Sequence, residues 1–463
     1  MKDKLLLILV CCIATIYYWC LPYATISNVR FLGVLGIVSL VISLWSWYNR
    51  GKQLFSPYII FLIVFYIFSY GIPILYAFGI TPERGLIGYL DISLQDLYDS
   101  QWLTVDMLVM FHVGAIFYVD NQPDINFKDE SIYEYEEFDN QEIRIKKTGW
   151  ILFVISVYFY VSKTIVDMMF SLTYGYSAMY EREEAIGLEN TASLLSDLFI
   201  PSVICLYVGY RNNNFVRRML TGLILLNVVS IFLMGGRTNG VILLVLVLIL
   251  YNNLVRNFKK KDYIVIACGV FILLSVLTAV GSMRNESNRS MKSSDIEVNG
   301  NAIVGAIAEM GASQSCLIKT MEIIPSMEDY KYGRSYLYSF TTIVPNLGFW
   351  DIHPAKKESN LSEWLTDRLR LSYGTGFSMT AEAYANFGYF GILFIFVLGY
   401  FFAKIFSGID HHLSNGEYAK FVFLLIIFWF TLKLPRNCFI GIVRPFFYYA
   451  GPIYMLCTKL KFR

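Results

Sequence analysis

The chain has 463 residues, of which 56% are hydrophobic and 16% are charged, with a formal net charge of +2. Soluble domains carry about 25% charged residues, and one soluble core rarely exceeds about 250–300 residues. This composition excludes an ordinary soluble enzyme and a disordered chain. Apolar runs of about 20 residues recur along the sequence and predict an all-α polytopic membrane protein.

We predict twelve membrane-spanning helices, each bounded to within a few residues. In chain order they cover residues 4–21, 31–48, 57–79, 102–118, 149–169, 194–210, 219–234, 241–254, 263–281, 385–404, 420–434 and 439–457. The first follows Lys2 and Lys4 but lacks an A-x-A cleavage site, so it is expected to be an uncleaved helix rather than a signal peptide. The run 241–254 is short for a full crossing, which favours a tilted or partial span.

Lysine and arginine are distributed unevenly between the short loops. Loops on the side of the N-terminus contain many of them, as at Arg144, Lys146 and Lys147 or Lys259 to Lys261. Loops on the other side contain few. Because cytoplasmic loops carry an excess of Lys and Arg, this pattern places both termini in the cytoplasm.

One outer segment, residues 282–384, is about 100 residues long and carries ten Lys or Arg residues. Loops of this length usually carry function. Apolar residues at helical spacing predict amphipathic helices from Ile303 to Ile324 and from Leu361 to Leu371, the second capped by Ser359 or Asn360. The chain thus divides into residues 1–281 with nine spans, the large outer loop 282–384, and residues 385–463 with three spans.

Arginines on the outer side are the main chemical signal. Arg237 lies between glycines at the tip of a tight hairpin, Arg284 and Arg289 begin the long loop, and Arg436 and Arg444 flank the last hairpin. Guanidinium groups grip phosphate in a bidentate manner, so these five side chains predict a site for a phosphate or pyrophosphate. Snorkelling arginines, salt bridges or independent surface charges are the alternatives.

Two further residues are candidates for proton transfer. Glu382 opens the tenth span without solvated neighbours, and it could act as a general base or pair with an arginine and hold it in place. His353 lies between Trp350 and Pro354; it could shuttle a proton, although packing or hydrogen bonding is its more common role. The eight cysteines form no C-x-x-C or Cys/His cluster, so neither a metal site nor a disulfide framework is expected.

Several short segments, together with the topology, resemble the bacterial O-antigen polymerases (Wzy, the oligosaccharide repeat-unit polymerases). The segments are Gly235–Gly240, Gly281–Arg284, Tyr332–Tyr336, Val344–Asn346 and Glu382–Gly388. The resemblance implies a glycosyltransferase with a GT-C-like fold that needs neither metal nor nucleotide sugar. It would join repeat units carried on undecaprenyl pyrophosphate at the periplasmic face and would work with a co-polymerase that sets chain length.

The same resemblance implies roles for individual residues. Arg237 and Arg284 would hold the pyrophosphate, with Arg289, Arg436 and Arg444 less firmly matched, and Glu382 would be the catalytic carboxylate. Two other functions stay open. An O-antigen ligase would use the same donor and transfer the glycan to the lipid A core. A flippase for the lipid-linked unit would be expected to show repeat symmetry and charges deep in the bundle.

Overall fold

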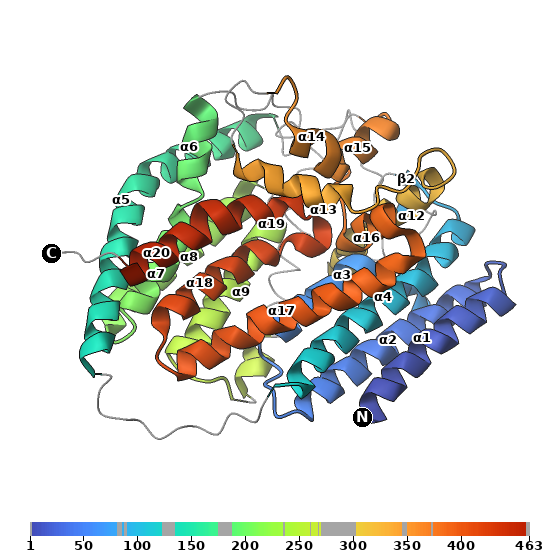
Figure 1. The fold of residues 1–463 in the computed structure, drawn as a ribbon, viewed down its shortest axis with the longest axis horizontal. Coiled ribbons are helices and arrows are strands. Elements are labelled where there is room, and N and C mark those ends of the chain that lie inside the picture. Colours follow the sequence, from blue (N-terminus) through green and yellow to red (C-terminus); the bar gives the residue numbers. More distant parts are fainter. Residues whose placement is uncertain are drawn as a thin grey trace. The chain divides into compact units, whose positions relative to one another are not determined.

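The computed structural model describes residues 2–80, 86–87, 90–122, 135–174, 188–234, 237–259, 261–266, 268–269, 302–344, 350–371 and 374–459 (Figure 1). The chain folds into two compact units: residues 1–124, 291–407 and 432–443 form the first, and residues 125–290, 408–431 and 444–463 form the second. The three consecutive segments expected from the sequence divide the chain by topology rather than by packing, and they stay a prediction.

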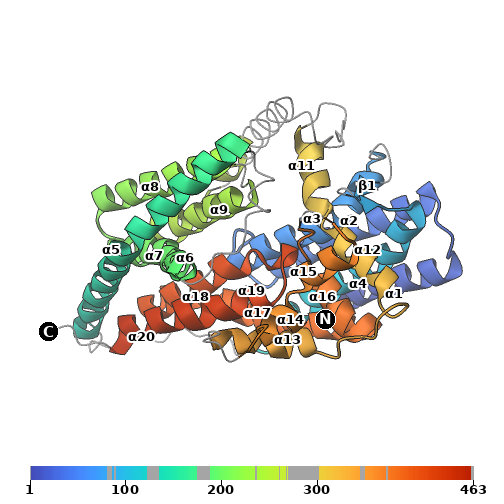
Figure 2. The same cartoon turned by 90° about the horizontal axis from the view of Figure 1, so that it is seen from above.

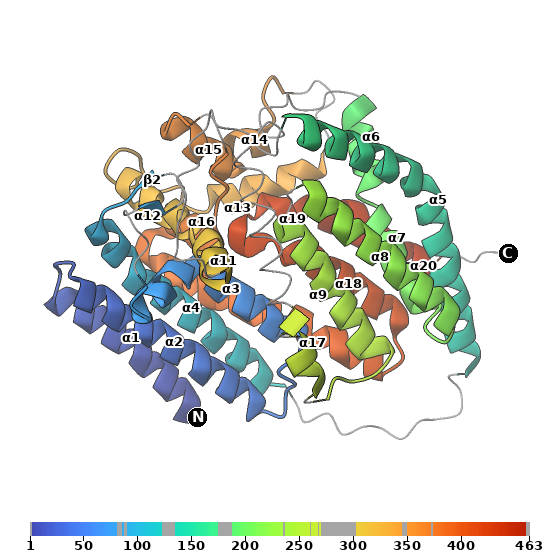
Figure 3. The same cartoon turned by 180° about the vertical axis from the view of Figure 1, so that it is seen from behind.

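The first unit contains the first four helices and most of the long loop. Its elements are α1 (Lys2–Cys20), α2 (Ile26–Tyr48), α3 (Pro57–Ala77), β1 (Leu86–Ile87), β2 (Leu90–Asp91), α4 (Leu94–Asp120), α11 (Ala302–Gly311), α12 (Gln314–Ile323), α13 (Arg334–Ser339), η3 (Phe340–Ile343), α14 (Pro354–Ser359), α15 (Leu361–Arg368), α16 (Met379–Phe387), η4 (Gly388–Phe390), the larger part of α17 (Gly391–Ser414) and η5 (Leu434–Arg436). Helices α1, α2 and α4 run side by side (Figures 1 and 3).

The second unit is built from helices in the middle and at the end of the chain. Its elements are α5 (Tyr135–Tyr174), α6 (Leu188–Ser196), α7 (Phe199–Gly209), α8 (Asn214–Met234), α9 (Arg237–Leu254), α18 (Tyr418–Thr431), η6 (Phe446–Ala450) and α20 (Gly451–Lys459). Helix α19 (Ile440–Pro445) spans the division between the two units. Helices α8 and α9 pack side by side, and α5 packs along α7 (Figure 3).

Side-chain caps explain where several helices begin. The Thr25 and Ser56 side chains accept hydrogen bonds from the backbone amides of Asn28 and Ile59, and Pro57 follows at the first position of α3. Ser93 and Asp96 form a reciprocal capping box at the start of α4. Each cap satisfies an amide that the helix leaves unpaired, so local sequence fixes these boundaries.

The observed helices agree with most of the predicted spans. Among the described residues, nine helices are long and apolar enough to cross a membrane: Lys2–Cys20, Ile26–Tyr48, Pro57–Ala77, Leu94–Asp120, Gln141–Ser171, Ala192–Gly209, Asn214–Met234, Met379–Ser414 and Tyr418–Arg436. Residues 239–254 form a shorter apolar helix, as expected. Most of the predicted span 263–281 lies outside the described residues, and the run 439–457 is divided among α19, η6 and α20. The all-α polytopic fold is therefore confirmed, whereas the count of twelve is not.

Glycines set the spacing between α4 and α17 in the first unit. A Cβ added to Gly114 would lie 2.0 Å from the Phe396 carbonyl oxygen, and one added to Gly399 would lie 1.9 Å from the Phe111 carbonyl oxygen. The two backbones therefore touch directly, as small residues allow between helices in membranes. The rings of Phe61, Phe111 and Phe402 pack beside this crossing, with centroids 5.1–5.8 Å apart.

We expect Gly114→Ala to lower the free energy of unfolding by about 1–3 kcal/mol, because the added methyl group forces the helices apart. The measurement is thermal unfolding of purified protein in detergent. Gly222→Ala in α8 is the control, since a Cβ there meets nothing within 4 Å and alanine favours helix. Equal melting temperatures for the two variants would contradict the close crossing.

The long loop is packed rather than open where the structure describes it. The stretch 303–324 is helical but is divided into α11 and α12, and α15 covers most of the stretch 361–371; Asn360 occupies the N-cap position of α15, but its side chain makes no capping hydrogen bond. Helix α11 crosses α3 closely: a Cβ on Gly71 would lie 2.8 Å from the Gly311 Cα. The loop therefore forms part of the first unit's core (Figure 2).

Candidate functional site

Glu382 lies in the first turn of α16 and is buried, with 1% of its surface exposed. Helix α16 begins there because the Ser378 side chain accepts a hydrogen bond from the Ala381 amide. A carboxylate at this position gains from the positive end of the helix dipole. Position and burial agree with the sequence expectation of a Glu without solvated neighbours.

Both carboxylate oxygens of Glu382 accept hydrogen bonds from other segments. The Ser335 hydroxyl in α13 donates to Oε1 at 2.7 Å, and the Phe439 backbone amide donates to Oε2 at 2.7 Å. Asn386 Nδ2 donates to Ser335 Oγ and to the Glu382 carbonyl oxygen, at 2.8 Å each. Glu382 thereby joins α16 to α13 and to the segment that follows η5. Among the described residues, no arginine contacts this carboxylate, so the alternative in which Glu382 holds an arginine in place gains no support there.

Local backbone geometry brings α13 to this place. The amides of Lys331 and Tyr332 donate to the carbonyls of Ala385 and Asn386 at 2.9 and 3.0 Å, which satisfies the end of α16. The chain then turns through Tyr332 at φ 48° and Gly333 at φ 81°, a conformation in which glycine is not strained. This turn places Ser335 and Tyr336 beside the buried carboxylate of Glu382.

The surroundings of Glu382 contain polar atoms without partners. Within the described part of the chain, the Tyr336 hydroxyl and Asn386 Oδ1 are buried and accept or donate no hydrogen bond. Burial, with Glu382 nearby, raises the pKa of the Tyr336 phenol well above its usual range, so the phenol keeps its proton. Buried polar groups are normally satisfied, so such atoms mark a place where a water or a ligand group would bind.

The predicted arginines fall into different parts of the chain. Arg436 ends η5 in the first unit, is exposed, and lies three residues before Phe439; its guanidinium carbon is 6.0 Å from the Phe68 ring centroid. Arg237 is the first residue of α9, and Arg444 lies 5.5 Å from the Tyr448 ring centroid, both in the second unit. Arg284 and Arg289 lie outside the described residues.

His353 caps a helix in the long loop. Its Nδ1 accepts from the Ala355 amide at 3.2 Å at the start of α14, and its Nε2 lies 3.0 Å from the Val344 carbonyl oxygen. The acceptor role of Nδ1 places the proton on Nε2, which then donates to Val344. Both ring nitrogens are engaged, as expected of a hydrogen-bonding histidine, and proton transfer by His353 stays a prediction.

Several other loop cations pair with nearby acidic groups. Arg368 pairs with Glu328, which also accepts from Trp364 Nε1 at 3.1 Å, and Lys331 lies 4.9 Å above the Trp364 ring. Burial lowers the pKa of Lys331. These contacts stabilise the loop's own fold, so the large number of basic loop residues is not by itself evidence for a ligand.

Sequence reasoning missed two partners of Glu382, namely Ser335 and the Phe439 amide. The spacing of Glu382 and Asn386 could have shown that these two side chains share a helix face. Nothing local indicates that residues 47 positions earlier and 57 positions later meet the carboxylate. Among the described residues, no group of three or more His, Cys, Asp or Glu side chains is arranged to hold a metal ion.

Comparison with known proteins identifies one family. The family model described as O-antigen polysaccharide polymerase Wzy matches residues 5–461. Searches of curated proteins and of solved structures gave no match. Because the family match runs along nearly the whole chain and the fold is helical and apolar, the protein is a multi-pass membrane enzyme of the polymerising glycosyltransferase type that belongs to the Wzy family of O-antigen polymerases.

Proposed function

We propose that the protein acts at the periplasmic face of the bacterial inner membrane and polymerises repeat units linked to undecaprenyl pyrophosphate. It transfers the growing glycan from its lipid carrier to the non-reducing end of a new lipid-linked unit. The family match over residues 5–461 is the observation that carries the proposal. The distribution of Lys and Arg supports the orientation, with both termini cytoplasmic.

The proposed chemistry is a glycosyl transfer with a pyrophosphate leaving group. An acceptor hydroxyl attacks the anomeric carbon of the donor, the bond from that carbon to the pyrophosphate oxygen breaks, and the lipid pyrophosphate leaves with the electron pair. A base takes the hydroxyl proton. Negative charge therefore develops on the leaving group, where fixed cations stabilise the transition state more than the ground state.

Arginines take the role of the fixed cations in this proposal. Arg237 fits this role for a second reason, because it is the first residue of α9. A helix N-terminus presents unpaired amides and a positive dipole end, which favour phosphate binding. Arg284, Arg289, Arg436 and Arg444 stay proposed pyrophosphate ligands, and the reaction is proposed to need no metal ion.

Glu382 is the proposed base. Each of its oxygens accepts one hydrogen bond and can accept a second, but Glu382 is buried, so the acceptor hydroxyl reaches it only if a covering segment moves aside. The Phe439 segment includes Arg436. One movement of this segment would therefore expose the Glu382 carboxylate and also shift a proposed pyrophosphate ligand. His353 is the second proposed proton carrier, and a chain-length-determining co-polymerase is the proposed partner.

Glycan profiling of a deletion strain tests the proposed function. We expect the strain to lose long glycan chains but to keep single repeat units attached at the cell surface, because flipping and ligation continue without polymerisation. Complementation with the full chain should restore the ladder of lengths on a gel. Loss of single repeats as well would instead assign the protein to flipping or ligation.

A further inference from the structure

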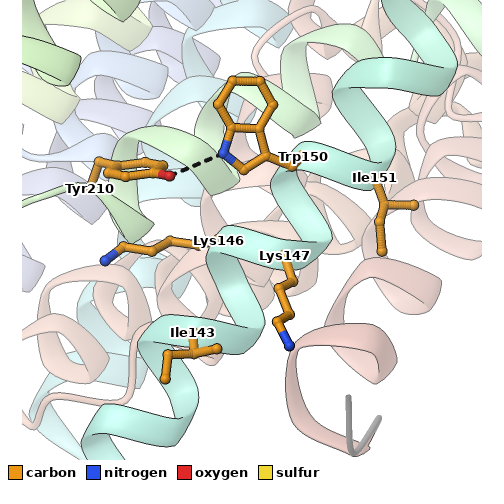
Figure 4. A pocket seen from close by; sticks show the side chains of 6 residues that line it. All are labelled: Ile143, Lys146, Lys147, Trp150, Ile151 and Tyr210. Atoms are coloured by element: carbon orange, nitrogen blue, oxygen red, sulfur yellow. Dashed lines mark hydrogen bonds between the residues drawn. The ribbon is translucent and has the colours of Figure 1, made fainter. Parts of the chain in front are cut away.

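A shallow cavity lies at the start of the membrane-spanning part of α5. It has a volume of about 410 Å³ and is lined by Ile143, Lys146, Lys147, Trp150, Ile151 and Tyr210 (Figure 4). All six residues belong to the second unit, and none takes part in the proposed transfer reaction. The predicted orientation places them at the cytoplasmic end of the fifth span.

The close packing of α5 against α7 holds the cavity in shape. A Cβ added to Gly209 would lie 2.8 Å from Lys146 Cγ, so the lysine stem rests directly on the end of α7. The Trp150 indole N–H donates to the Tyr210 hydroxyl at 3.1 Å (Figure 4). Lys146 Nζ lies 4.9 Å from the centroid of the Tyr210 ring. Two aromatic rings and a cation are thus fixed relative to one another.

The charge beside the cavity is positive. Glu142 is shared between two cations, since it pairs with Lys146 at 2.6 Å and with Arg211 at 2.8 Å. Lys147 and Arg144 add two further positive charges next to the apolar run. After Glu142, the next acidic residue of α5 is Asp167, roughly four or more turns beyond the residues that line the cavity. An anion is therefore the complementary ligand.

The other side of the cavity is apolar and exposed. The exposed fractions of Ile143, Trp150 and Ile151 are 50%, 47% and 44%. A tryptophan with its ring exposed and its N–H paired is typical of the membrane interface. Along α5, Lys146 and Lys147 are followed by Trp150 and Ile151 toward the apolar run, which is the order of groups in a phospholipid from the phosphate to the acyl chains, whereas Ile143 lies about one turn before the lysines.

We propose that this cavity binds an anionic phospholipid of the cytoplasmic leaflet. Lys146 and Lys147 contact the phosphodiester, and an acyl chain lies along Trp150 and Ile151. Basic pockets between membrane helices on this side favour anionic headgroups over zwitterionic ones, because the latter carry a compensating positive charge. The bound lipid would anchor α5 and α7 at a fixed depth, independently of the transfer reaction.

Native mass spectrometry of the purified, delipidated full chain tests this site. We expect phosphatidylglycerol to bind more tightly than phosphatidylcholine. Each lysine near a charged lipid surface contributes a factor of about five. The Lys146→Gln/Lys147→Gln variant should therefore weaken phosphatidylglycerol binding by about 25-fold and leave phosphatidylcholine binding unchanged. Glu142 keeps Arg211 as its partner in this variant, so the helix crossing is retained.

Lys259→Gln is the matched control, because it removes the same charge from another basic loop on the predicted cytoplasmic side. It should leave lipid selectivity unchanged. Each single lysine variant should bind phosphatidylglycerol about fivefold more weakly, which keeps the test valid if the double variant is poorly produced. Equal binding of the two lipids by the unaltered protein, or full selectivity in the lysine variants, would overturn the proposal. Because binding is measured without glycan synthesis, this result is separate from the test of polymerase function.

Discussion

Replacing Arg237 or Arg284 with alanine is expected to abolish long glycan chains while single repeat units still reach the cell surface. The guanidinium group would neutralise charge that develops on the leaving pyrophosphate, and loss of one such group typically lowers turnover by about 10²–10³-fold. At Arg237 the first turn of α9 would still present its amides, so donor binding would be weakened less than turnover. Gel profiling of surface glycan in a complemented deletion strain measures the effect.

Arg218→Ala is the control for these variants. Arg218 is exposed in α8, on the side predicted to face the cytoplasm, so its loss should leave the glycan ladder unchanged. Immunoblots of membrane fractions must show equal insertion of all variants. If both the Arg237 and the Arg284 variant make full-length polymer, the proposal that these arginines bind the pyrophosphate is wrong.

Glu382→Gln is expected to lower polymerisation by about 10²–10⁴-fold with little change in melting temperature. The glutamine oxygen can accept the Phe439 amide as the carboxylate does, and the Ser335 hydroxyl can accept from the new amide group. The hydrogen-bonded connection is thereby kept, but the side chain can no longer take a proton. Polymer synthesis in membranes and thermal unfolding of the purified protein measure the two effects separately.

Glu382→Ala provides the comparison. It leaves the Phe439 amide and the Ser335 hydroxyl without their buried acceptor, and each such loss costs about 1–3 kcal/mol. Both polymerisation and stability should therefore fall. If Glu382→Gln instead makes normal polymer while Glu382→Ala does not, then Glu382 positions the Phe439 segment and another group is the base.

Much of the fold follows from local sequence. Apolar run length and the helical spacing in 303–324 and 361–371 predict helices in these places, because each signal depends on residues within a few turns of one another. The caps at Thr25, Ser56 and Ser93 are equally local, although the structure rather than the sequence analysis identified them. The run 439–457 was harder to predict. Its composition indicates one span, whereas Pro445 and the π-helical turn at Phe446–Ala450 divide it into shorter pieces.

The sequence by itself determined that this chain spans a membrane many times, which loops carry positive charge, and which arginines and carboxylates are unusual for their surroundings. Each of these properties depends on the composition of a single segment, so it can be inferred without knowing which segments pack together. Only the tertiary structure decided that Ser335 and the Phe439 amide bind Glu382, and that Gly209 seats Lys146 beside Trp150 and Tyr210. Contacts of this kind join residues far apart in the chain. They depend on how closely two backbones approach each other, and a local sequence pattern does not determine that distance.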